Sequence, residues 1–248
     1  LKVAADAPTA GWLRDERRMY EALRGGAFLP ILHAWDDDGA LPLLALEDLS
    51  PARWPPPWTP GDVERVLTSL GQVASTRPPA FLKSLAEQRE TLSGWKRVAQ
   101  DPRPFLSLGL CSAAWFERAL PTLVRAERDA VLDGDDLLHL DVRSDNLCFA
   151  RGRTSLVDWN WVCRGNRLFD VAFWLPSLHA EGGPAPETVL PDAPELAAVV
   201  SGFFASMAGL PVLPHAPRVR VVQRQQLETA LPWAARALDL PPLATLKQ

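Results

Sequence analysis

The sequence predicts an α+β protein with two lobes, a small first lobe that contains strands and a larger, mostly helical second lobe. Two apolar runs around a polar turn lie before residue 50, as in a pair of antiparallel strands. From residue 61 to residue 133, apolar residues recur every three or four positions, which indicates helices. With 248 residues, 47% of them hydrophobic, the chain can fill a core in each lobe, and we expect the lobes to span residues 1–50 and 51–248.

The first lobe is expected to begin with a short apolar strand that carries Lys2. A helix over residues 12–23 follows, since its apolar residues fall near one face. Residues 29–35 and 41–46 are the two antiparallel strands, and the Asp- and Gly-containing residues 36–39 form the turn between them.

The second lobe is expected to begin with a stiff linker, because residues 51–60 are rich in Pro and Trp. The next helix starts at the capping residue Asp62 and runs to Leu70. Residues 113–132 are also helical, and Pro121 marks either a kink or a boundary between shorter helices. Three further helices are predicted at residues 171–179, around 194–208 and at 217–238.

Composition excludes several classes of protein. The formal net charge of −4 argues against a general nucleic-acid binder, which needs a basic surface. No apolar run approaches the ~20 residues of a membrane-spanning helix, and no secretory signal is visible. The three cysteines form no Cys-x-x-Cys pair, so we expect a reduced, cytoplasmic setting. The number of copies in an assembly is left open.

Three signals that together suit phosphoryl transfer lie in one order between residues 138 and 170. They are His139-Leu-Asp141-Val-Arg143-Ser-Asp145-Asn146, then Asp158-Trp-Asn, and then Gly165 with Asp170. Phosphoryl transfer needs a carboxylate that accepts a proton from the attacking hydroxyl, and oxygen ligands for Mg²⁺. Asp141 suits the first role as a general base or hydroxyl-orienting group.

A predicted hairpin brings the metal ligands together. Residues 147–149 and 155–157 read as short strands joined by a turn at residues 151–153. The hairpin would return Asp158 to the side of Asn146. Mg²⁺ prefers one or two carboxylates, an amide oxygen, waters and phosphate oxygens, so Asn146 and Asp158 are the predicted metal ligands.

These residues resemble the motifs of the aminoglycoside phosphotransferase family, which belongs to the wider group of protein-kinase-like folds. The family pattern His-x-Asp-x-x-x-x-Asn, a later Asp, and a Gly followed by Asp and an apolar helix is matched over residues 138–175. The resemblance implies a two-lobed kinase-like fold, ATP or alternatively GTP as phosphate donor, Mg²⁺ as cofactor and a small-molecule hydroxyl as acceptor. Aminoglycoside, sugar, choline-like and amino-acid acceptors all stay open, with antibiotic resistance as one open role.

The resemblance also implies where the nucleotide binds. In the family a strand Lys and a helix Glu form an ion pair that orients the α- and β-phosphates, and Lys2 and Glu16 look like these residues. Glu47, Asp48 and Leu49 resemble the hinge between the lobes, near residues 46–49, whose backbone meets the adenine edge. The alternative is that Lys2 and Glu16 are solvent-exposed charges and that Glu47 and Asp48 form a solvated turn.

Other residues of the motif have more than one interpretation. Arg143 could bind the γ-phosphate through its forked donors, or it could only pair with Asp145. His139 is expected to be structural and to bond to backbone beneath the loop. Asp170 is expected both to cap the helix that follows it and to brace the loop. Trp159, Trp161 and Trp174 could line a substrate face, although aromatic residues here are more often core.

The family's phosphate-covering loop is missing, since no Gly-x-Gly-x-x-Gly occurs in the sequence. The first lobe is therefore expected to be truncated, lacking the first strands and this loop. Because the chain does not begin with Met, we expect it to start inside a longer product. The leading interpretation is a small-molecule kinase, and the alternative is a catalytically impaired kinase-like binding protein. A protein kinase is disfavoured because no Ala-Pro-Glu segment follows Asp158.

Overall fold

The computed structural model describes residues 1–243, and these residues form two compact units. Unit 1 contains Leu1–Ser84 and Gly134–Val171, and unit 2 contains Leu85–Asp133 and the chain from Ala172 onward. The expected boundary between the two lobes at residue 50 stays a prediction. Every residue of the predicted site lies in unit 1.

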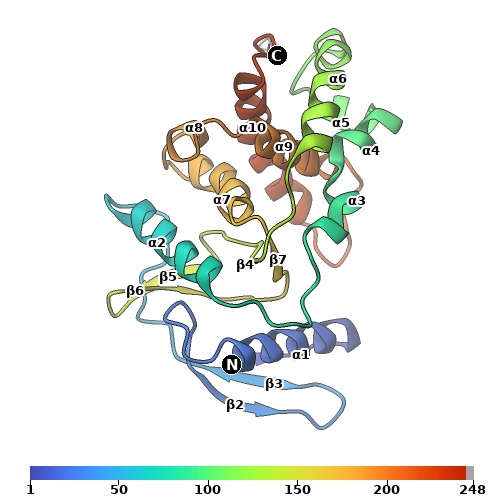
Figure 1. Ribbon diagram of the computed structural model, residues 1–248. Helices are drawn as coiled ribbons and strands as arrows, with labels where there is room; N and C mark the ends of the chain where they lie inside the picture. Colours follow the sequence, from blue (N-terminus) through green and yellow to red (C-terminus); the bar gives the residue numbers. More distant parts are fainter. Residues whose placement is uncertain (244–248) are drawn as a thin grey trace. The chain divides into compact units, whose positions relative to one another are not determined.

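The first part of unit 1 is a three-stranded antiparallel sheet with one helix (Figure 1). Its strands are β1 (Lys2–Val3), β2 (Leu32–Asp36) and β3 (Leu43–Leu46), in the order β1-β3-β2. Lys2 is paired with Leu44, so the lysine strand lies beside the strand that leads to residues 46–49. The three predicted strands are confirmed.

The helix of this part, α1 (Ala7–Ala22), packs on all three strands and begins earlier than predicted. Asp6 and Thr9 form a capping box, in which the Asp6 carboxylate accepts the N–H of Thr9 at 2.9 Å. Pro8 in the first turn also suits a helix start. The apolar periodicity begins only at Leu13. It therefore locates the buried face of the helix but not the residue at which the helix begins.

The rest of unit 1 surrounds a hairpin. Its elements are α2 (Asp62–Ser75), β4 (Asp136–Leu138), β5 (Leu147–Ala150), β6 (Arg153–Leu156) and β7 (Cys163–Gly165). The predicted hairpin is confirmed as β5 and β6, which pair with Leu147 opposite Leu156. Asp62 was wrongly predicted as an N-cap, because Gly61 holds that position and the Asp62 carboxylate instead accepts the N–H of Thr59.

Unit 2 is helical. Besides a short 3₁₀ turn, η1 (Ala86–Gln88), it contains α3 (Arg89–Leu92), α4 (Gly94–Gln100), α5 (Arg103–Leu106), α6 (Ala113–Asp129), α8 (Pro186–Val189), α9 (Pro194–Ala208) and α10 (Val219–Ala237). Helix α7 (Leu168–Ala180) begins in unit 1 and continues into unit 2. Helix α9 is central and packs on α4, α6 and α10. Helix α6 continues through Pro121, so of the two alternatives predicted there the boundary between shorter helices is wrong.

A buried carboxylate joins two helices of unit 2. Glu127 of α6 is 3% exposed and accepts the N–H groups of Trp95 and Lys96 at 2.9 and 3.1 Å. These groups lie at the start of α4, where N–H groups lack partners within the helix. Burial raises the pKa of the Glu127 carboxyl to about 7, although the N–H groups oppose this shift.

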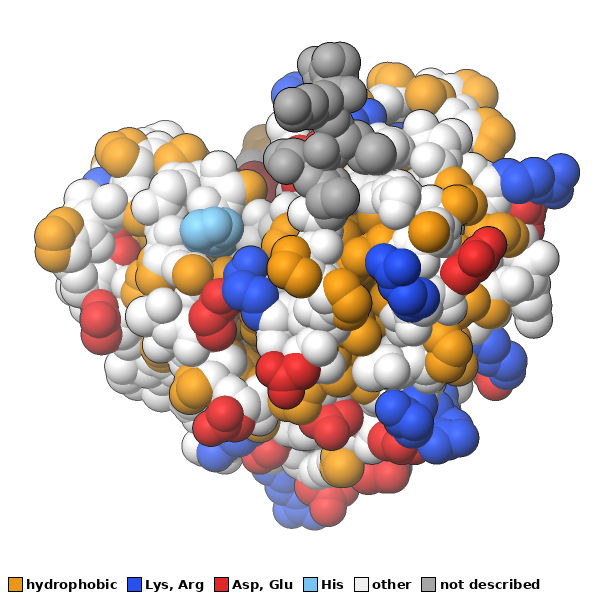
Figure 2. Space-filling model, turned by 90° about the horizontal axis from the view of Figure 1, so that it is seen from above, with side chains coloured by type: hydrophobic (Ala, Val, Ile, Leu, Met, Phe, Trp, Pro, Cys, Tyr) orange, Lys and Arg blue, Asp and Glu red, His pale blue; other side chains and the backbone are white. Residues whose placement is uncertain are grey.

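The charges, the cysteines and the helices of the structure can be described beside the composition. Acidic and basic side chains are interspersed on the face shown in Figure 2. Cys111, Cys148 and Cys163 are buried free thiols. Within residues 1–243, the structure has no helix with the length and apolar character that crossing a bilayer needs.

Candidate active site

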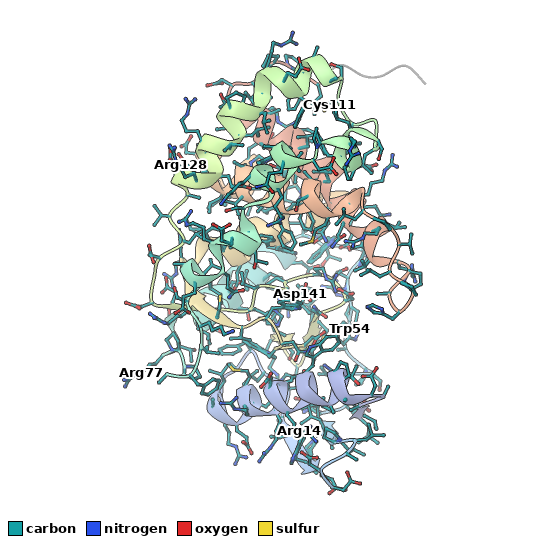
Figure 3. The ribbon with its side chains drawn as sticks, turned by 90° about the vertical axis from the view of Figure 1, so that its right-hand side faces the viewer. Arg14, Trp54, Arg77, Cys111, Arg128 and Asp141 are labelled. Carbon is teal, nitrogen blue, oxygen red and sulfur yellow. The ribbon has the colours of Figure 1, made fainter. Side chains whose placement is uncertain are left out.

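Asp141 lies on the loop between β4 and β5 (Figure 3), where Asn146 and Arg143 hold it. The amide nitrogen of Asn146 donates to a carboxylate oxygen of Asp141 at 2.8 Å and to its backbone carbonyl at 2.9 Å. The Arg143 Nε lies 3.3 Å from the other carboxylate oxygen, as an ion pair without hydrogen-bond geometry. Burial raises the pKa of the Asp141 carboxyl, and Arg143 opposes this shift.

Arg143 pairs with two carboxylates at once. Its Nη2 donates to Asp145 at 3.2 Å, while Nε faces Asp141. The predicted pair with Asp145 is therefore present. The guanidinium also lies next to the carboxylate at the centre of the motif, so the phosphate-binding role of Arg143 stays a prediction.

His139 supports this loop from beneath, as expected for a structural residue. It is fully buried, and its Nδ1 accepts the Asp141 N–H at 3.2 Å. Its Nε2 lies 3.0 Å from the carbonyl of Val157, so the tautomer that satisfies both contacts carries the proton on Nε2. Burial lowers the pKa of His139 to about 4, which keeps the ring neutral at pH 7.

Asp170 braces the same loop. Its two carboxylate oxygens accept the N–H groups of His139 and Leu140 at 2.9 and 2.7 Å. Leu140 has a φ of 60°, which is costly for a residue with a side chain and needs outside support. The bracing role is thus confirmed, whereas the capping role is wrong because Asp170 lies inside the first turn of α7.

The hairpin places Asn146 and Asp158 at the same end. Asn146 comes directly before β5, and Asp158 follows β6 by two residues. The N–H of Val157 donates to the carbonyl of Asn146 at 2.9 Å and closes this end of the hairpin. Asp158 has a φ of 65°, which turns the chain away from the strand direction directly after the hairpin.

Lys2 and Glu16 meet beside Asp158. The Lys2 Nζ lies 2.8 Å from both carboxylate oxygens of Glu16 and 3.7 Å from a carboxylate oxygen of Asp158. The Glu16 side chain is 1% exposed, so its charge needs this partner. Burial raises the pKa of the Glu16 carboxyl, and Lys2 opposes the shift. The alternative that both are merely solvent-exposed charges is excluded for Glu16.

The tryptophans differ in exposure. Trp159 is 1% exposed and packs edge-on against the His139 ring, with centroids 4.6 Å apart. Trp174 is also fully buried, so the core interpretation holds for both. Trp161, three residues after Asp158, is 63% exposed.

Residues 46–49 line a cavity together with the start of the chain. The cavity has a volume of about 330 Å³, and its walls are formed by Leu1, Lys2 and residues Leu46–Leu49. The side chains of Glu47 and Asp48 serve local structure: Asp48 accepts the N–H of Ser50 at 2.9 Å, and Glu47 accepts that of Ile31 at 3.2 Å. The carboxylates of Glu47 and Asp48 therefore already have partners within the protein.

Two arginines of the hairpin turn were missed in the sequence. Arg153 donates to the Glu47 carboxylate, and Arg151 lies 3.4 Å from it. The two basic residues of this Arg-Gly-Arg turn are a signal in the sequence that an acidic partner lies nearby. Sequence alone does not say which acidic residue would face the turn.

The metal-binding prediction can be compared with the donor atoms present. Among residues 1–243, no group of three or more His, Cys, Asp or Glu side chains is arranged to hold a metal ion. The predicted ligands, however, are one carboxylate and one amide oxygen, completed by phosphate oxygens and water. Asn146 uses its amide nitrogen for both bonds to Asp141, which leaves the carboxamide oxygen as its ligand atom, and the Asp158 side chain is 38% exposed. These donors fit Mg²⁺ bound together with a nucleotide.

Comparison with known proteins identifies the fold. No protein-family model matches the chain, and no curated protein matches it. A choline/ethanolamine kinase family protein from Mesorhizobium loti has a TM-score of 0.61 and 13% identity, over 91% of this chain and 81% of that one. Choline kinase LicA from Streptococcus pneumoniae has a TM-score of 0.57 and 14% identity, over 96% and 85%. A thermostable mutant of aminoglycoside phosphotransferase APH(4)-Ia, in a complex with ADP and hygromycin B, has a TM-score of 0.52 and 17% identity, over 96% and 83%.

The class of fold is therefore the protein-kinase-like one. Within that class, the resemblance to aminoglycoside phosphotransferases is confirmed at the level of the fold, which choline and ethanolamine kinases share. The expected truncation of the first lobe stays a prediction.

Proposed function

We propose that this protein is a small-molecule kinase that transfers the γ-phosphate of ATP to a hydroxyl group. The observation that carries the proposal is the arrangement of charged groups in unit 1. Asp141 is bonded to Asn146, and Asp158, at the same end of the hairpin as Asn146, lies beside the Lys2–Glu16 pair. A base, metal ligands and a phosphate-facing cation are the parts that phosphoryl transfer requires.

Asp141 orients the acceptor hydroxyl. The hydroxyl oxygen attacks the γ-phosphorus, the bond from phosphorus to the β–γ bridging oxygen breaks, and the hydroxyl proton passes to the Asp141 carboxylate. A strong base is not needed, because the transition state is loose and depends mostly on alignment. The Asn146 amide and Arg143 hold the carboxylate in one orientation.

Asn146 and Asp158 would hold Mg²⁺ through the carboxamide oxygen and the carboxylate. When bound, the ion supplies positive charge to the phosphate oxygens. Lys2, which Glu16 holds at 2.8 Å, would contact the α- and β-phosphates, and Arg143 would contact the γ-phosphate.

The base of the nucleotide is assigned to the cavity of residues 46–49. Lys2 lines this cavity and also approaches Asp158, so one side chain lies between the base cavity and the metal ligands. ATP is the proposed donor, with GTP as the alternative. The acceptor is a small hydroxylated molecule, for which aminoglycosides, sugars, choline-like compounds and amino acids remain candidates.

The test is consumption of ATP in the presence of Mg²⁺ over a panel of hydroxylated metabolites and aminoglycosides, with phosphorylated product identified by mass spectrometry. We expect at least one acceptor to raise ATP consumption above the water background. A thermal-shift titration with Mg-ATP accompanies it. Binding without turnover on any acceptor would favour the impaired binding protein, and no binding would refute the nucleotide site.

A further inference from the structure

Arg153, at the start of β6, bonds to three separate backbone or side-chain acceptors. Its Nη1 donates to the carbonyl of Ala27 at 3.2 Å and to the carbonyl of Leu29, and its Nη2 donates to the Glu47 carboxylate. The Arg153 side chain is 25% exposed, so these bonds are partly shielded from water. The guanidinium thus joins the hairpin of the metal ligands to the segment before β2 and to the end of β3.

Glu47 continues this connection into the base cavity. Its side chain is 5% exposed, its carboxylate accepts the N–H of Ile31 at 3.2 Å, and its own N–H donates to the carbonyl of Ile31 at 2.8 Å. Burial by itself would raise the pKa of this carboxyl, but the hydrogen bonds from Arg153 and Ile31 bring it below its ordinary value. Glu47 is therefore a buried anion that depends on Arg153, and it forms part of the cavity wall.

A second contact joins the β5–β6 hairpin to the chain that follows residues 46–49. The N–H of Arg53 donates to the carbonyl of Phe149 at 3.1 Å, and the N–H of Phe149 donates back at 2.9 Å. The Arg53 guanidinium lies 4.4 Å from the centre of the Phe149 ring. The chain on both sides of Asp48 is consequently attached to the β5–β6 hairpin.

We propose that Arg153 is a positioning residue, which with Glu47 fixes the nucleotide-base cavity relative to the hairpin that carries Asn146 and Asp158. The inference rests on the proposed function. The hairpin is only two-stranded, so its own ladder cannot set its distance from residues 46–49. A nucleotide spans both places, and a shift of about 1 Å between them can cost on the order of 100-fold in rate.

The test compares two ligands in the full chain. Mg-ATP reaches both the base cavity and the metal ligands, whereas adenosine reaches only the cavity. Arg153→Met removes the charge and keeps the apolar stem, and we expect it to raise the Kd for Mg-ATP about tenfold or more while the Kd for adenosine changes less than about twofold. Arg151→Met is the matched control, since its side chain is 74% exposed and touches the same carboxylate from outside. It should leave both constants unchanged.

A second pair of variants separates positioning from folding. Arg153→Met leaves the Glu47 carboxylate as a buried anion, so we expect this variant to lose stability. Combining it with Glu47→Gln removes that anion. We expect the double variant to regain stability but to keep the weak Mg-ATP binding. Equal changes for adenosine and Mg-ATP, or no change for either, would overturn the positioning role. Failure of the unmodified chain to bind Mg-ATP would instead overturn the proposed function.

Discussion

The amide nitrogen of Asn146 donates a hydrogen bond to the Asp141 carboxylate at 2.8 Å. One residue proposed as a metal ligand thereby orients the residue proposed to receive the hydroxyl proton. The backbone directly before Asp141 needs support, since Leu140 has a φ of 60°, and the Asp170 carboxylate accepts the Leu140 N–H. The position of the Asp141 side chain consequently depends on the backbone conformation of the loop as well as on the side-chain hydrogen bond from Asn146.

Replacing Asp141 by Asn tests the proposed chemistry. The amide keeps the size of the side chain but cannot accept the proton, so we expect kcat to fall about 10²–10⁴-fold with little change in the KM for ATP. Steady-state kinetics with the best acceptor of the panel is the measurement. Asp135→Asn is the control, because that carboxylate is 95% exposed and pairs only with Arg164 among the ion pairs found in residues 1–243. Full activity of Asp141→Asn would exclude the mechanism.

The Lys2–Glu16 pair should contribute to stability as well as to nucleotide binding. Lys2→Met leaves the 1%-exposed Glu16 carboxylate without its cation. Since Lys2 itself is 38% exposed and water screens the pair, we expect a loss of about 1–2 kcal/mol in the free energy of unfolding. Adding Glu16→Gln should restore most of it. Urea denaturation measures both, and a double variant no more stable than the single one would contradict the pairing.

The Glu127 carboxyl predicts a pH dependence of stability. Its pKa is about 7 in the folded protein against an ordinary value of 4.5, so the folded state binds this proton more tightly than the unfolded state. The free energy of unfolding should therefore fall as the pH rises from 4.5 to about 7, by on the order of 2 kcal/mol from this group. Glu127→Gln should flatten the curve over that range.

Urea midpoints at several pH values between 4.5 and 8 measure this effect, and Glu117→Gln on the same helix is the control. Glu117 is exposed, so its variant should follow the unmodified curve. Parallel curves for the Glu127 variant and the unmodified chain would show that the carboxyl does not titrate as expected.

Two glycines in helices should respond in opposite ways to substitution by Ala. A Cβ on Gly94 would lie 1.8 Å from the carbonyl oxygen of Gly202, where α4 crosses α9, and we expect a loss of about 3 kcal/mol. A Cβ on Gly71 in α2 would meet no atom within 4 Å. Gly71→Ala should therefore stabilise by about 0.5–1 kcal/mol, through helix propensity alone. Thermal unfolding of both variants measures these changes. An unchanged stability of Gly94→Ala would contradict the close crossing of α4 and α9.

Local patterns in the sequence located most elements, because they depend on nearby residues. The hairpin at residues 147–157 and helix α9 follow from short-range periodicity and turn residues. Helix starts were less well located: α1 begins at a capping box rather than at its first apolar residue, and Asp62 caps nothing. Side-chain roles that depend on a distant partner, such as Asp170 with His139 and Leu140, needed the fold.

The sequence by itself determined the local elements that carry Asp141, Asn146 and Asp158, since a loop and a hairpin depend on neighbouring residues. Only the tertiary structure decided which groups from elsewhere in the chain meet them. Lys2 reaches Glu16 and Asp158 because β1 pairs with β3, and Arg153 reaches Glu47 across 106 positions of sequence. Such pairs are set by the packing of whole elements, and no short stretch of residues contains the information that selects them.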